Sequence, residues 1–169
     1  MKRLILIALQ VLLFSTQASA ALKLNDPAPL FSLHDVTGKE FSLGNVVGVG
    51  SINKGNGAVV SFFASWCMPC RHELPIINAL VGELRGKGIT VVLIDVKENV
   101  HTIEALLKEL KVDQPVVLSD ADGKTSEKYD LRFLPTTFFI GADGRLKDVI
   151  YGEIDNASQL RASAEKLLK

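Results

Sequence analysis

Along this chain, short apolar runs alternate with stretches in which apolar residues recur at the spacing of a helix. Residues 58–63 and 89–96 are mostly apolar, β-branched or aromatic, a pattern typical of strands buried on both faces of a sheet. Each run is followed by apolar residues at the spacing of an amphipathic helix: Ile77, Leu80, Val81 and Leu84 after the first, and Ile103, Leu106, Leu107 and Leu110 after the second. The first helix is expected to end near residues 86–88. Strands that alternate with helices predict parallel pairing through crossover connections.

The second half of the chain predicts a hairpin and a terminal helix. Residues 136–140 and 147–151 flank Gly-Ala-Asp-Gly at residues 141–144, which favours a turn between antiparallel strands. Three further elements are expected: a short strand at residues 115–118, a short helix at 123–129, and a terminal helix with the apolar face Leu160, Ala164, Leu167 and Leu168 and with Asp155 or Asn156 as its cap. The whole pattern indicates one α/β domain.

Ahead of these elements the pattern predicts a second hairpin and a loop. Residues 30–33 and 40–43 alternate between apolar and polar positions around a turn at residues 35–39. The two prolines within residues 25–29 favour an extended leader. Residues 44–57 are rich in glycine and asparagine but lack the Gly-Lys-Ser/Thr order of a phosphate loop, so we expect a flexible loop there.

The only two cysteines of the chain lie at the junction between the first buried strand and its helix. Two thiols separated by two residues on a first helical turn can close a disulfide with little backbone rearrangement. The unpaired amides of a helix N-terminus favour the thiolate of Cys67, the form that attacks a disulfide. Cys70 lies one turn deeper and suits the resolving role. Pro69 is tolerated, since the amide that it lacks would be unpaired there.

Two other interpretations of the cysteine pair are weak. A closed zinc site needs four ligands, and the chain has no second pair of cysteines to supply them. A purely structural disulfide across so short a loop would remove little entropy from the unfolded chain. We therefore expect no metal and no cofactor.

The sequence around the cysteines resembles the active site of the thioredoxin superfamily, and most closely its extracytoplasmic TlpA/ResA branch. Residues 62–75 read Phe-Phe-Ala-Ser-Trp-Cys-Met-Pro-Cys-Arg-His-Glu-Leu-Pro, with Pro75 at the place of the proline that kinks this helix in thioredoxins. Residues 134–138, Leu-Pro-Thr-Thr-Phe, resemble the cis-proline loop of the family. The resemblance implies an α/β, thioredoxin-like fold: a central mixed sheet flanked by helices, with an N-terminal β-hairpin extension.

The resemblance also implies the other site residues. Pro135 would follow a cis peptide bond, and the backbone groups of Leu134 and Thr136 would pair with an extended segment of the substrate. Trp66 is either a core residue or part of the apolar surface that meets the partner. Glu73, one helical turn after Cys70, either handles the proton of that thiol or is an ordinary glutamate on the helix surface.

Arg71 and His72 follow the pair on the helix, and either would stabilise a thiolate by its positive charge, His72 only when protonated. The simpler interpretation, which we favour, is a solvated helix face.

The first twenty residues have the pattern of a signal peptide. Lys2 and Arg3 precede an apolar stretch at residues 4–14, and Ala-Ser-Ala at residues 18–20 forms a small-residue cleavage site. The apolar stretch is shorter than the roughly 20 residues of a membrane span. We expect cleavage after Ala20, leaving one domain at residues 21–169 in a bacterial periplasm, with an uncleaved membrane anchor as the alternative. No cysteine lies near the cleavage site, so we expect no lipid anchor.

The charge balance excludes some partners. The chain has 19 basic and 19 acidic residues, and the loss of the signal peptide removes two basic ones. A nearly neutral chain does not indicate binding to nucleic acid or to an anionic membrane. The expected partners are instead protein thiols and disulfides.

The predicted function is that of an exported thiol-disulfide oxidoreductase. Its resemblance to the TlpA/ResA branch favours the reducing direction, with a membrane thiol transporter as electron donor and apocytochrome c as one possible substrate. A dedicated cytochrome-maturation thioredoxin would carry Gly-Val-Tyr-Gly-x-Pro-Glu, whereas residues 129–136 read Tyr-Asp-Leu-Arg-Phe-Leu-Pro-Thr.

The sequence leaves three alternatives to this function. A peroxiredoxin needs threonine three residues before its reactive cysteine, where this chain has Ala64. A Sco-like copper chaperone needs three residues between its cysteines, where this chain has two. A non-catalytic module that keeps the cysteine pair is the third.

Overall fold

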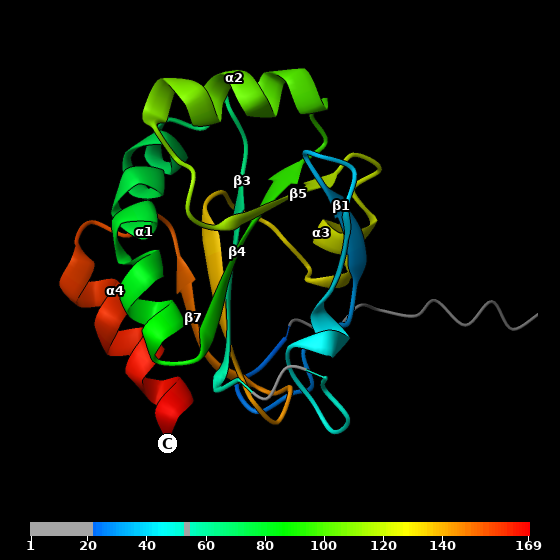
Figure 1. The fold of residues 1–169 in the computed structure, drawn as a ribbon, viewed down its shortest axis with the longest axis vertical. Helices are drawn as coiled ribbons and strands as arrows, with labels where there is room; N and C mark the ends of the chain where they lie inside the picture. The colour runs from blue at the N-terminus through cyan, green and yellow to red at the C-terminus, as the bar shows by residue number, and fades with distance from the viewer. Residues whose placement is uncertain (1–21, 53–54) are drawn as a thin grey trace, which may run out of the picture.

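The computed structural model describes residues 22–52 and 55–169, which form one seven-stranded sheet with helices packed against it (Figure 1). The predicted signal peptide lies outside these residues. The strands are β1 (Ser32–Asp35), β2 (Glu40–Ser42), β3 (Gly57–Phe63), β4 (Ile89–Val96), β5 (Val116–Asp120), β6 (Thr136–Gly141) and β7 (Leu146–Tyr151). The helices are α1 (Met68–Gly86), α2 (Val100–Leu110), α3 (Lys124–Lys128) and α4 (Ala157–Ala164), with 3₁₀ turns η1 (Leu43–Asn45) and η2 (Glu165–Leu168). In the described part of the chain, no helix has the length and apolarity needed to cross a bilayer.

The sheet has the mixed topology that the sequence predicts. Its strand order is β2-β1-β5-β4-β3-β6-β7. The strands β3, β4 and β5 are parallel, and β6 and β7 complete the sheet as an antiparallel pair beside β3. The carboxyl ends of the three parallel strands therefore meet at one edge, which is where β3 leads into α1.

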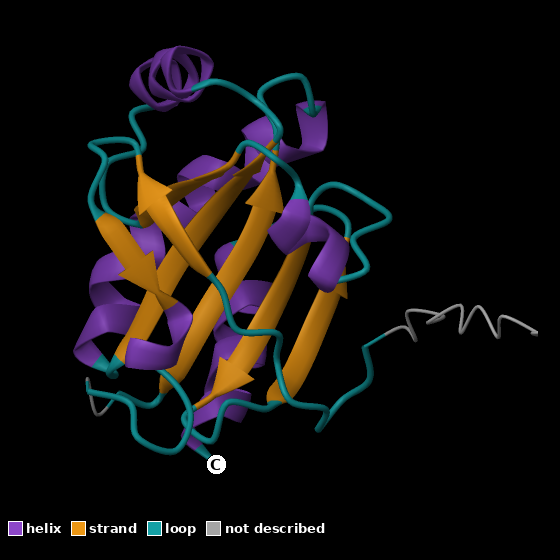
Figure 2. Cartoon of the chain, turned by 90° about the vertical axis from the view of Figure 1, so that its right-hand side faces the viewer, coloured by secondary structure: helices purple, strands orange, loops and turns teal. Residues whose placement is uncertain are grey.

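The alternating side chains of β3 divide the core into two layers. Val59 and Phe63 pack with the apolar faces of α1, α2 and α4, whereas Val60 and Phe62 pack with the N-terminal segment, η1 and Tyr129. Every residue of β3 is buried, as expected for a central strand covered on both faces. Figure 1 shows α1 and α4 side by side, and Figure 2 shows the strands with helices behind them.

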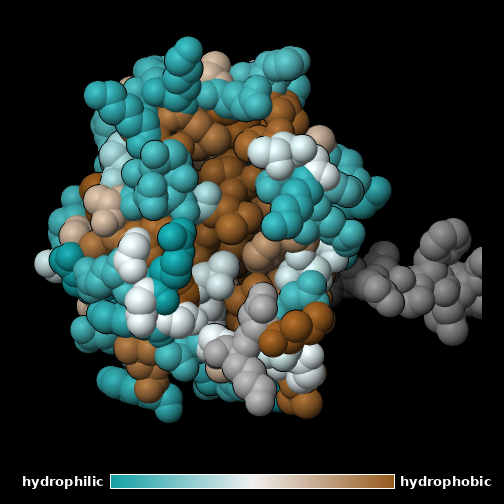
Figure 3. Space-filling model, in the orientation of Figure 1, coloured by the Kyte–Doolittle hydropathy of each residue, from teal (hydrophilic) through white to brown (hydrophobic). Residues whose placement is uncertain are grey.

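Part of the face that carries α1 remains open. Figure 3 shows apolar residues gathered in a hollow between α1 and β1, over the middle of the sheet. A depression along α1, β4 and β5 is lined in part by Val81, Ile89, Val91 and Val116. In Figure 1, α2 lies across the carboxyl ends of the strands.

The N-terminal hairpin forms two residues later than the sequence predicts for its first strand. Leu30 is exposed, and β1 pairs with β2 through the register Leu33↔Phe41. The side chain of Asp35 shapes the turn by accepting hydrogen bonds from the amides of Thr37 and Lys39. The hairpin is also joined to the main sheet, because β1 pairs with β5.

The C-terminal helix begins at a predicted cap residue, and its last turn becomes a 3₁₀ turn. Asn156 accepts a hydrogen bond from the amide of Gln159 at 3.0 Å, so it is the cap. After Ala164 the chain tightens into η2, in which Leu167 is buried and Leu168 is 45% exposed. Leu168 is therefore not part of the buried face predicted for this helix.

Tyr129 allows a test of the second core layer. Its ring contacts Phe31, Phe62 and Phe138, and no group among the described residues hydrogen-bonds to its buried hydroxyl. We expect Tyr129→Phe to raise the free energy of unfolding by about 1 kcal/mol, because it removes an unsatisfied polar atom and keeps the ring. Urea unfolding measures this change.

The matched control for that variant is Tyr151→Phe, since Tyr151 is 65% exposed and should not respond. A loss of stability in Tyr129→Phe would show that the hydroxyl has a partner in the folded protein.

Candidate active site

The cysteine pair lies where β3 ends and α1 begins. Cys67 is the N-cap of α1, and its Sγ accepts a hydrogen bond from the amide of Cys70 at 3.2 Å. The two residues form a disulfide. Cys67 is 5% exposed and Cys70 is fully buried, so the first sulfur is the more accessible one, as the sequence predicts. An amide aimed at Cys67 Sγ, at the positive end of a helix, favours the thiolate once the disulfide is reduced.

Glu73 is fully buried, which excludes the interpretation as a helix-surface glutamate. One carboxyl oxygen accepts a hydrogen bond from Ser61 Oγ at 3.0 Å, and the other accepts one from the amide of Ile154 at 2.9 Å. Thr137 Oγ1 donates in turn to Ser61 Oγ at 3.0 Å. The carboxyl group therefore joins α1 to β3, β6 and the segment before α4.

Burial raises the pKa of Glu73 to about 7. The hydrogen bonds from Ile154 and Ser61 act in the opposite direction, and the charge of nearby Glu153 adds to the rise. A carboxyl group with this pKa gains and loses its proton near neutral pH.

The proline loop lies next to the same junction. The Leu134–Pro135 peptide bond is cis, as the resemblance implies. The loop is fixed by two hydrogen bonds: Thr136 Oγ1 donates to the Phe133 carbonyl at 2.9 Å, and the Gly152 amide donates to the Pro135 carbonyl at 2.9 Å. Thr136 begins β6 directly opposite Phe62 of β3, so the loop is held at the strand end that leads to the cysteines.

Large apolar side chains are exposed around this site. Trp66 is 70% exposed and Phe133 is 64% exposed. Trp66 is therefore a surface residue and not part of the core. A shallow depression is lined by both of these side chains and by Val96, Leu131, Arg132 and Leu134. The structure thus brings Trp66 and the proline loop together on one apolar surface.

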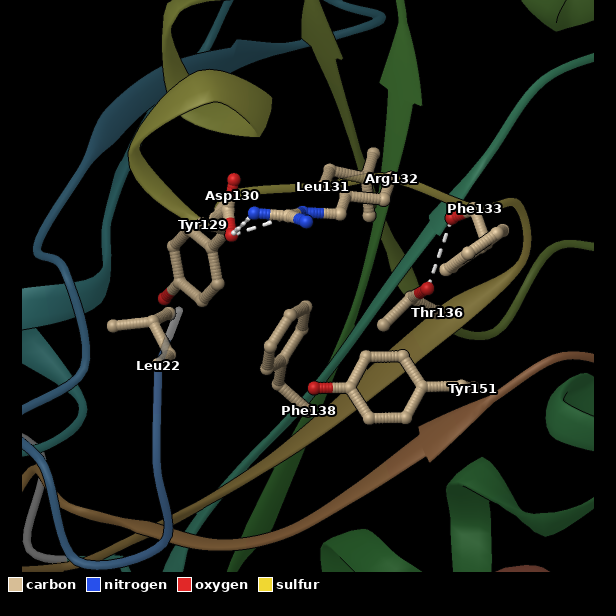
Figure 4. Close-up of a pocket in the computed structure, with 9 residues that line it drawn as sticks. All are labelled: Leu22, Tyr129, Asp130, Leu131, Arg132, Phe133, Thr136, Phe138 and Tyr151. Carbon is tan, nitrogen blue, oxygen red and sulfur yellow. Dashed lines mark hydrogen bonds and ion pairs between the residues drawn. The ribbon is translucent and has the colours of Figure 1, made fainter. Parts of the chain in front are cut away.

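A deeper cavity of about 210 Å³ lies behind the proline loop (Figure 4). Its apolar lining includes Phe133, Phe138 and the ring of Tyr151. Arg132 also lines the cavity, and its guanidinium is paired with Asp130 at 2.9 Å. The cavity shares residues 131–133 with the shallow depression, so the two form one continuous surface.

Arg71 and His72 are engaged by carboxylates. Arg71 forms an ion pair with Glu109 of α2, and it also donates to the Ser65 carbonyl at 3.4 Å. His72 Nδ1 lies 3.3 Å from a carboxyl oxygen of Glu153. Within residues 22–52 and 55–169, no group of three histidine, cysteine or acidic side chains is arranged to hold a metal ion.

A pair of acids near the site was missed by the sequence analysis. Asp95 is fully buried at the end of β4, opposite Phe63 of β3. Glu98 follows in the next loop and accepts two hydrogen bonds of 2.6 Å from the amide and the hydroxyl of Ser65. The signal available in the sequence was an acid at the end of a buried parallel strand, since that end meets the active-site edge of the sheet.

Comparisons with known proteins agree with this geometry. The family model described as AhpC/TSA family matches residues 24–149. The thiol-disulfide oxidoreductase ResA of Bacillus subtilis is 33% identical over 125 residues, which are 74% of this chain and 65% of that protein. The match therefore spans just under two thirds of this relative's length.

Solved structures share the whole fold. A putative thiol:disulfide interchange protein DsbE from Chlorobium tepidum matches with a TM-score of 0.75 and 26% identity, covering 88% of this chain and all of that one. A secreted disulfide oxidoreductase from Mycobacterium tuberculosis matches with a TM-score of 0.63 and 20% identity, covering 82% of this chain and 94% of that one. At that identity, the second likeness shows the fold alone.

The raised pKa of Glu73 predicts a pH-dependent stability. Unfolding returns the carboxyl group from a pKa of about 7 to its ordinary value of 4.5. Stability from this group is therefore full below pH 4.5, falls as the pH rises, and is lost above about 7. Relative to Glu73→Gln, we expect the free energy of unfolding of the wild type to fall by about 3 kcal/mol across this range. Chemical unfolding at several pH values measures the difference.

The control is Glu40→Gln, because Glu40 is exposed on β2. It should follow the wild-type curve. Parallel curves for wild type and Glu73→Gln would mean that the pKa of Glu73 is the same in the folded and the unfolded chain.

Proposed function

We propose that this chain, which belongs to the AhpC/TSA family and is a homologue of thiol-disulfide oxidoreductases, reduces protein disulfides outside the cytoplasm. The observation that carries the proposal is the placement of Cys67 as the N-cap of α1, with Cys70 buried behind it and cis-Pro135 alongside. This arrangement activates one thiol, protects the other and provides a backbone edge for a substrate.

The reaction begins with the reduced pair. The Cys67 thiolate attacks one sulfur of the substrate disulfide, which forms a mixed disulfide and releases the other substrate sulfur as a thiolate. The Cys70 thiolate then attacks Cys67 Sγ and releases the second substrate sulfur. Two electrons pass to the substrate, the two thiol protons end on the two substrate thiols, and Cys67 and Cys70 are left as a disulfide.

Glu73 is proposed to handle the proton of Cys70. It lies three residues after Cys70 on α1, and residues at this spacing lie on one side of a helix. Its pKa of about 7 lets it accept the thiol proton when Cys70 becomes a nucleophile and pass that proton on toward the departing substrate thiolate. The hydroxyls of Ser61 and Thr137 keep the carboxyl group hydrogen-bonded while it changes protonation.

The substrate is proposed to dock on the apolar surface beside Cys67. An extended segment would pair with the backbone of Leu134 and Thr136. Trp66 and Phe133 would cover the reacting sulfurs and exclude water. The cavity behind the loop is large enough to take one apolar side chain of the substrate, and its polar rim is Arg132.

The location and the physiological substrate follow from the leader and from the resemblance to the TlpA/ResA branch. Residues 1–20 would direct export to a periplasm, with cleavage after Ala20, and an uncleaved anchor is the alternative. A membrane thiol transporter would supply the electrons. The CxxCH cysteines of apocytochrome c are one substrate that fits the reducing direction.

The other candidate functions lack a supporting observation. A peroxidase would need a threonine at the position of Ala64, and a Sco-like copper chaperone would need a third residue between Cys67 and Cys70. A non-catalytic module has no use for a sulfur that is activated at a helix N-terminus.

Replacement of each cysteine separates the two roles. Cys67→Ser should reduce insulin in the presence of dithiothreitol no faster than dithiothreitol alone, because it lacks the attacking thiolate. Cys70→Ala should retain the first step and accumulate mixed disulfides in periplasmic extracts, which mass spectrometry identifies.

The opposite pattern would contradict these roles: full activity in Cys67→Ser, or mixed disulfides that form only through Cys70. If reduced Cys70→Ala captured no oxidised protein while the oxidised wild type oxidised reduced ones, the reducing direction would be wrong.

The proposed docking surface predicts an effect on substrate affinity. Trp66→Ala and Phe133→Ala should each raise KM for a protein disulfide about three- to tenfold, since each removes a large apolar contact. Activity toward a small disulfide such as oxidised glutathione should change less.

The matched control is Ile52→Ala. Ile52 is 77% exposed and lies in the loop before β3, at the other end of that strand from Cys67. Equal effects of all three variants on KM would contradict the assignment of this surface.

A further inference from the structure

The loop that carries Cys67 is held from both sides at Ser65. Glu98 accepts hydrogen bonds of 2.6 Å from the amide and the hydroxyl of Ser65. Arg71 donates to the Ser65 carbonyl at 3.4 Å. Every polar group of Ser65 is therefore engaged, two residues before the sulfur that reacts. Glu98 supplies the two shorter contacts, so its position determines the position of this loop.

Glu98 is in turn held by Asp95. The Glu98 amide donates to Asp95 Oδ1 at 3.1 Å, which fixes the backbone of the loop. Asp95 is fully buried, and its Oδ2 has no donor among the described residues. Asp95 and Glu98 lie three positions apart in the sequence, and each carboxyl group shifts the pKa of the other. Two carboxylates cannot hydrogen-bond without a proton, and a proton on Asp95 Oδ2 would satisfy that otherwise unpaired atom.

We propose that Asp95 and Glu98 share one proton, and that this carboxyl pair positions the Ser65 loop for disulfide exchange at Cys67. The inference rests on the proposed function. Asp95 and Glu98 act through Ser65 and are positioning residues. While the proton is present, Asp95 is neutral and donates to Glu98, whose charge is left to hold Ser65. When the proton is lost, two adjacent negative charges repel and Glu98 is pushed from its place.

The surroundings of the pair favour a single negative charge. Burial raises the pKa of Asp95 to about 8, and the neighbouring carboxylates of Glu98 and Asp120 add to the rise. Burial acts to raise the pKa of Glu98 as well, but hydrogen bonds from Asp95 and Ser65 outweigh it and lower the pKa. The pair is thus protonated at neutral pH and loses its proton as the pH rises through about 8.

Other charged groups near the pair come from three elements. Asp120 of β5 already accepts hydrogen bonds from the amides of Thr125 and Ser126. Arg71 of α1 is paired with Glu109 of α2, and His101 of α2 lines the same surface depression as Ser65. On the β3 side the neighbour of Asp95 is apolar Phe63. Lys97, which stands between the two acids in the sequence, extends its side chain over Gly123. Arg71 contacts Ser65 directly.

Trp66 provides a direct measure of the loop, because it follows Ser65 and is the only tryptophan of the chain. We expect its fluorescence in the oxidised protein to change in a step with a midpoint near pH 8. The cysteines are disulfide-bonded in this form and do not titrate. Asp95→Asn should abolish the step, because an amide donates to Glu98 at every pH. Glu98→Gln should move any remaining step to lower pH, because a neutral neighbour eases the ionisation of Asp95.

Two controls isolate the pair from other acids. Glu104→Gln, at an exposed position on α2, should keep the step unchanged. Glu73→Gln should also keep it, because Glu73 titrates near pH 7 and its hydrogen-bond partners are Ser61 and Ile154 rather than Ser65. A step that persists in Asp95→Asn, or that is missing from the folded wild type, would overturn the proposal.

Exchange kinetics complete the test. The rate constant for disulfide exchange is first divided by the fraction of Cys67 present as thiolate. In the wild type, this normalised rate constant should fall about three- to tenfold between pH 7 and 9, because one hydrogen bond at the loop is lost. Asp95→Asn should not show this fall. A fluorescence step without disulfide exchange at any pH would contradict the proposed function and support the carboxyl pair. Disulfide exchange without the fluorescence step would support the proposed function and contradict the carboxyl pair.

Discussion

Glu73 accepts hydrogen bonds from two segments that are far apart in the sequence, Ser61 in β3 and Ile154 ahead of α4. Because these contacts are fully buried, they fix how α1 lies across the sheet. The N-terminus of α1 then falls at the end of β3, where Cys67 caps the helix. The orientation of the reactive sulfur, the burial of Cys70 and the approach of the proline loop all depend on this one packing arrangement.

Periodicity was sufficient to predict most of the fold. The runs at residues 58–63 and 89–96 are buried strands with the predicted helices after them, because their short length and their β-branched and aromatic residues distinguish them from buried helix segments. The first hairpin was displaced because its apolar residues are few: Leu30 is exposed, and the turn is set by the side chain of Asp35. The pairing of β1 with β5 joins segments more than eighty residues apart, and local patterns carry no such information.

The same distinction between local and long-range features applies to the candidate active site. The spacing of Cys67 and Cys70 is a local feature, so the sequence predicted the disulfide. The cis peptide bond before Pro135 was implied only by the resemblance to the thioredoxin superfamily. Whether Glu73 faced the core could not be decided, because its partners Ser61 and Ile154 come from other elements. The contact of Glu98 with Ser65 could not be predicted for the same reason, because the two residues lie 33 positions apart in the sequence.

Burying an acidic side chain costs folding free energy, and Glu73 and Asp95 are both placed where this cost is incurred. Glu73 and Asp95 are both fully buried, and burial raises the pKa of each, to about 7 and about 8. An apolar residue at either position would avoid the cost of dehydrating a carboxyl group, so stability alone does not account for them. Both lie near the edge of the sheet that carries the cysteine pair. Each can hold a proton while the cysteines carry negative charge, which limits the total charge buried there. On this argument, the pKa values of the two acids set the pH range in which the disulfide can form and break. These pKa values are raised because the surrounding sheet buries the carboxyl groups at a low dielectric constant.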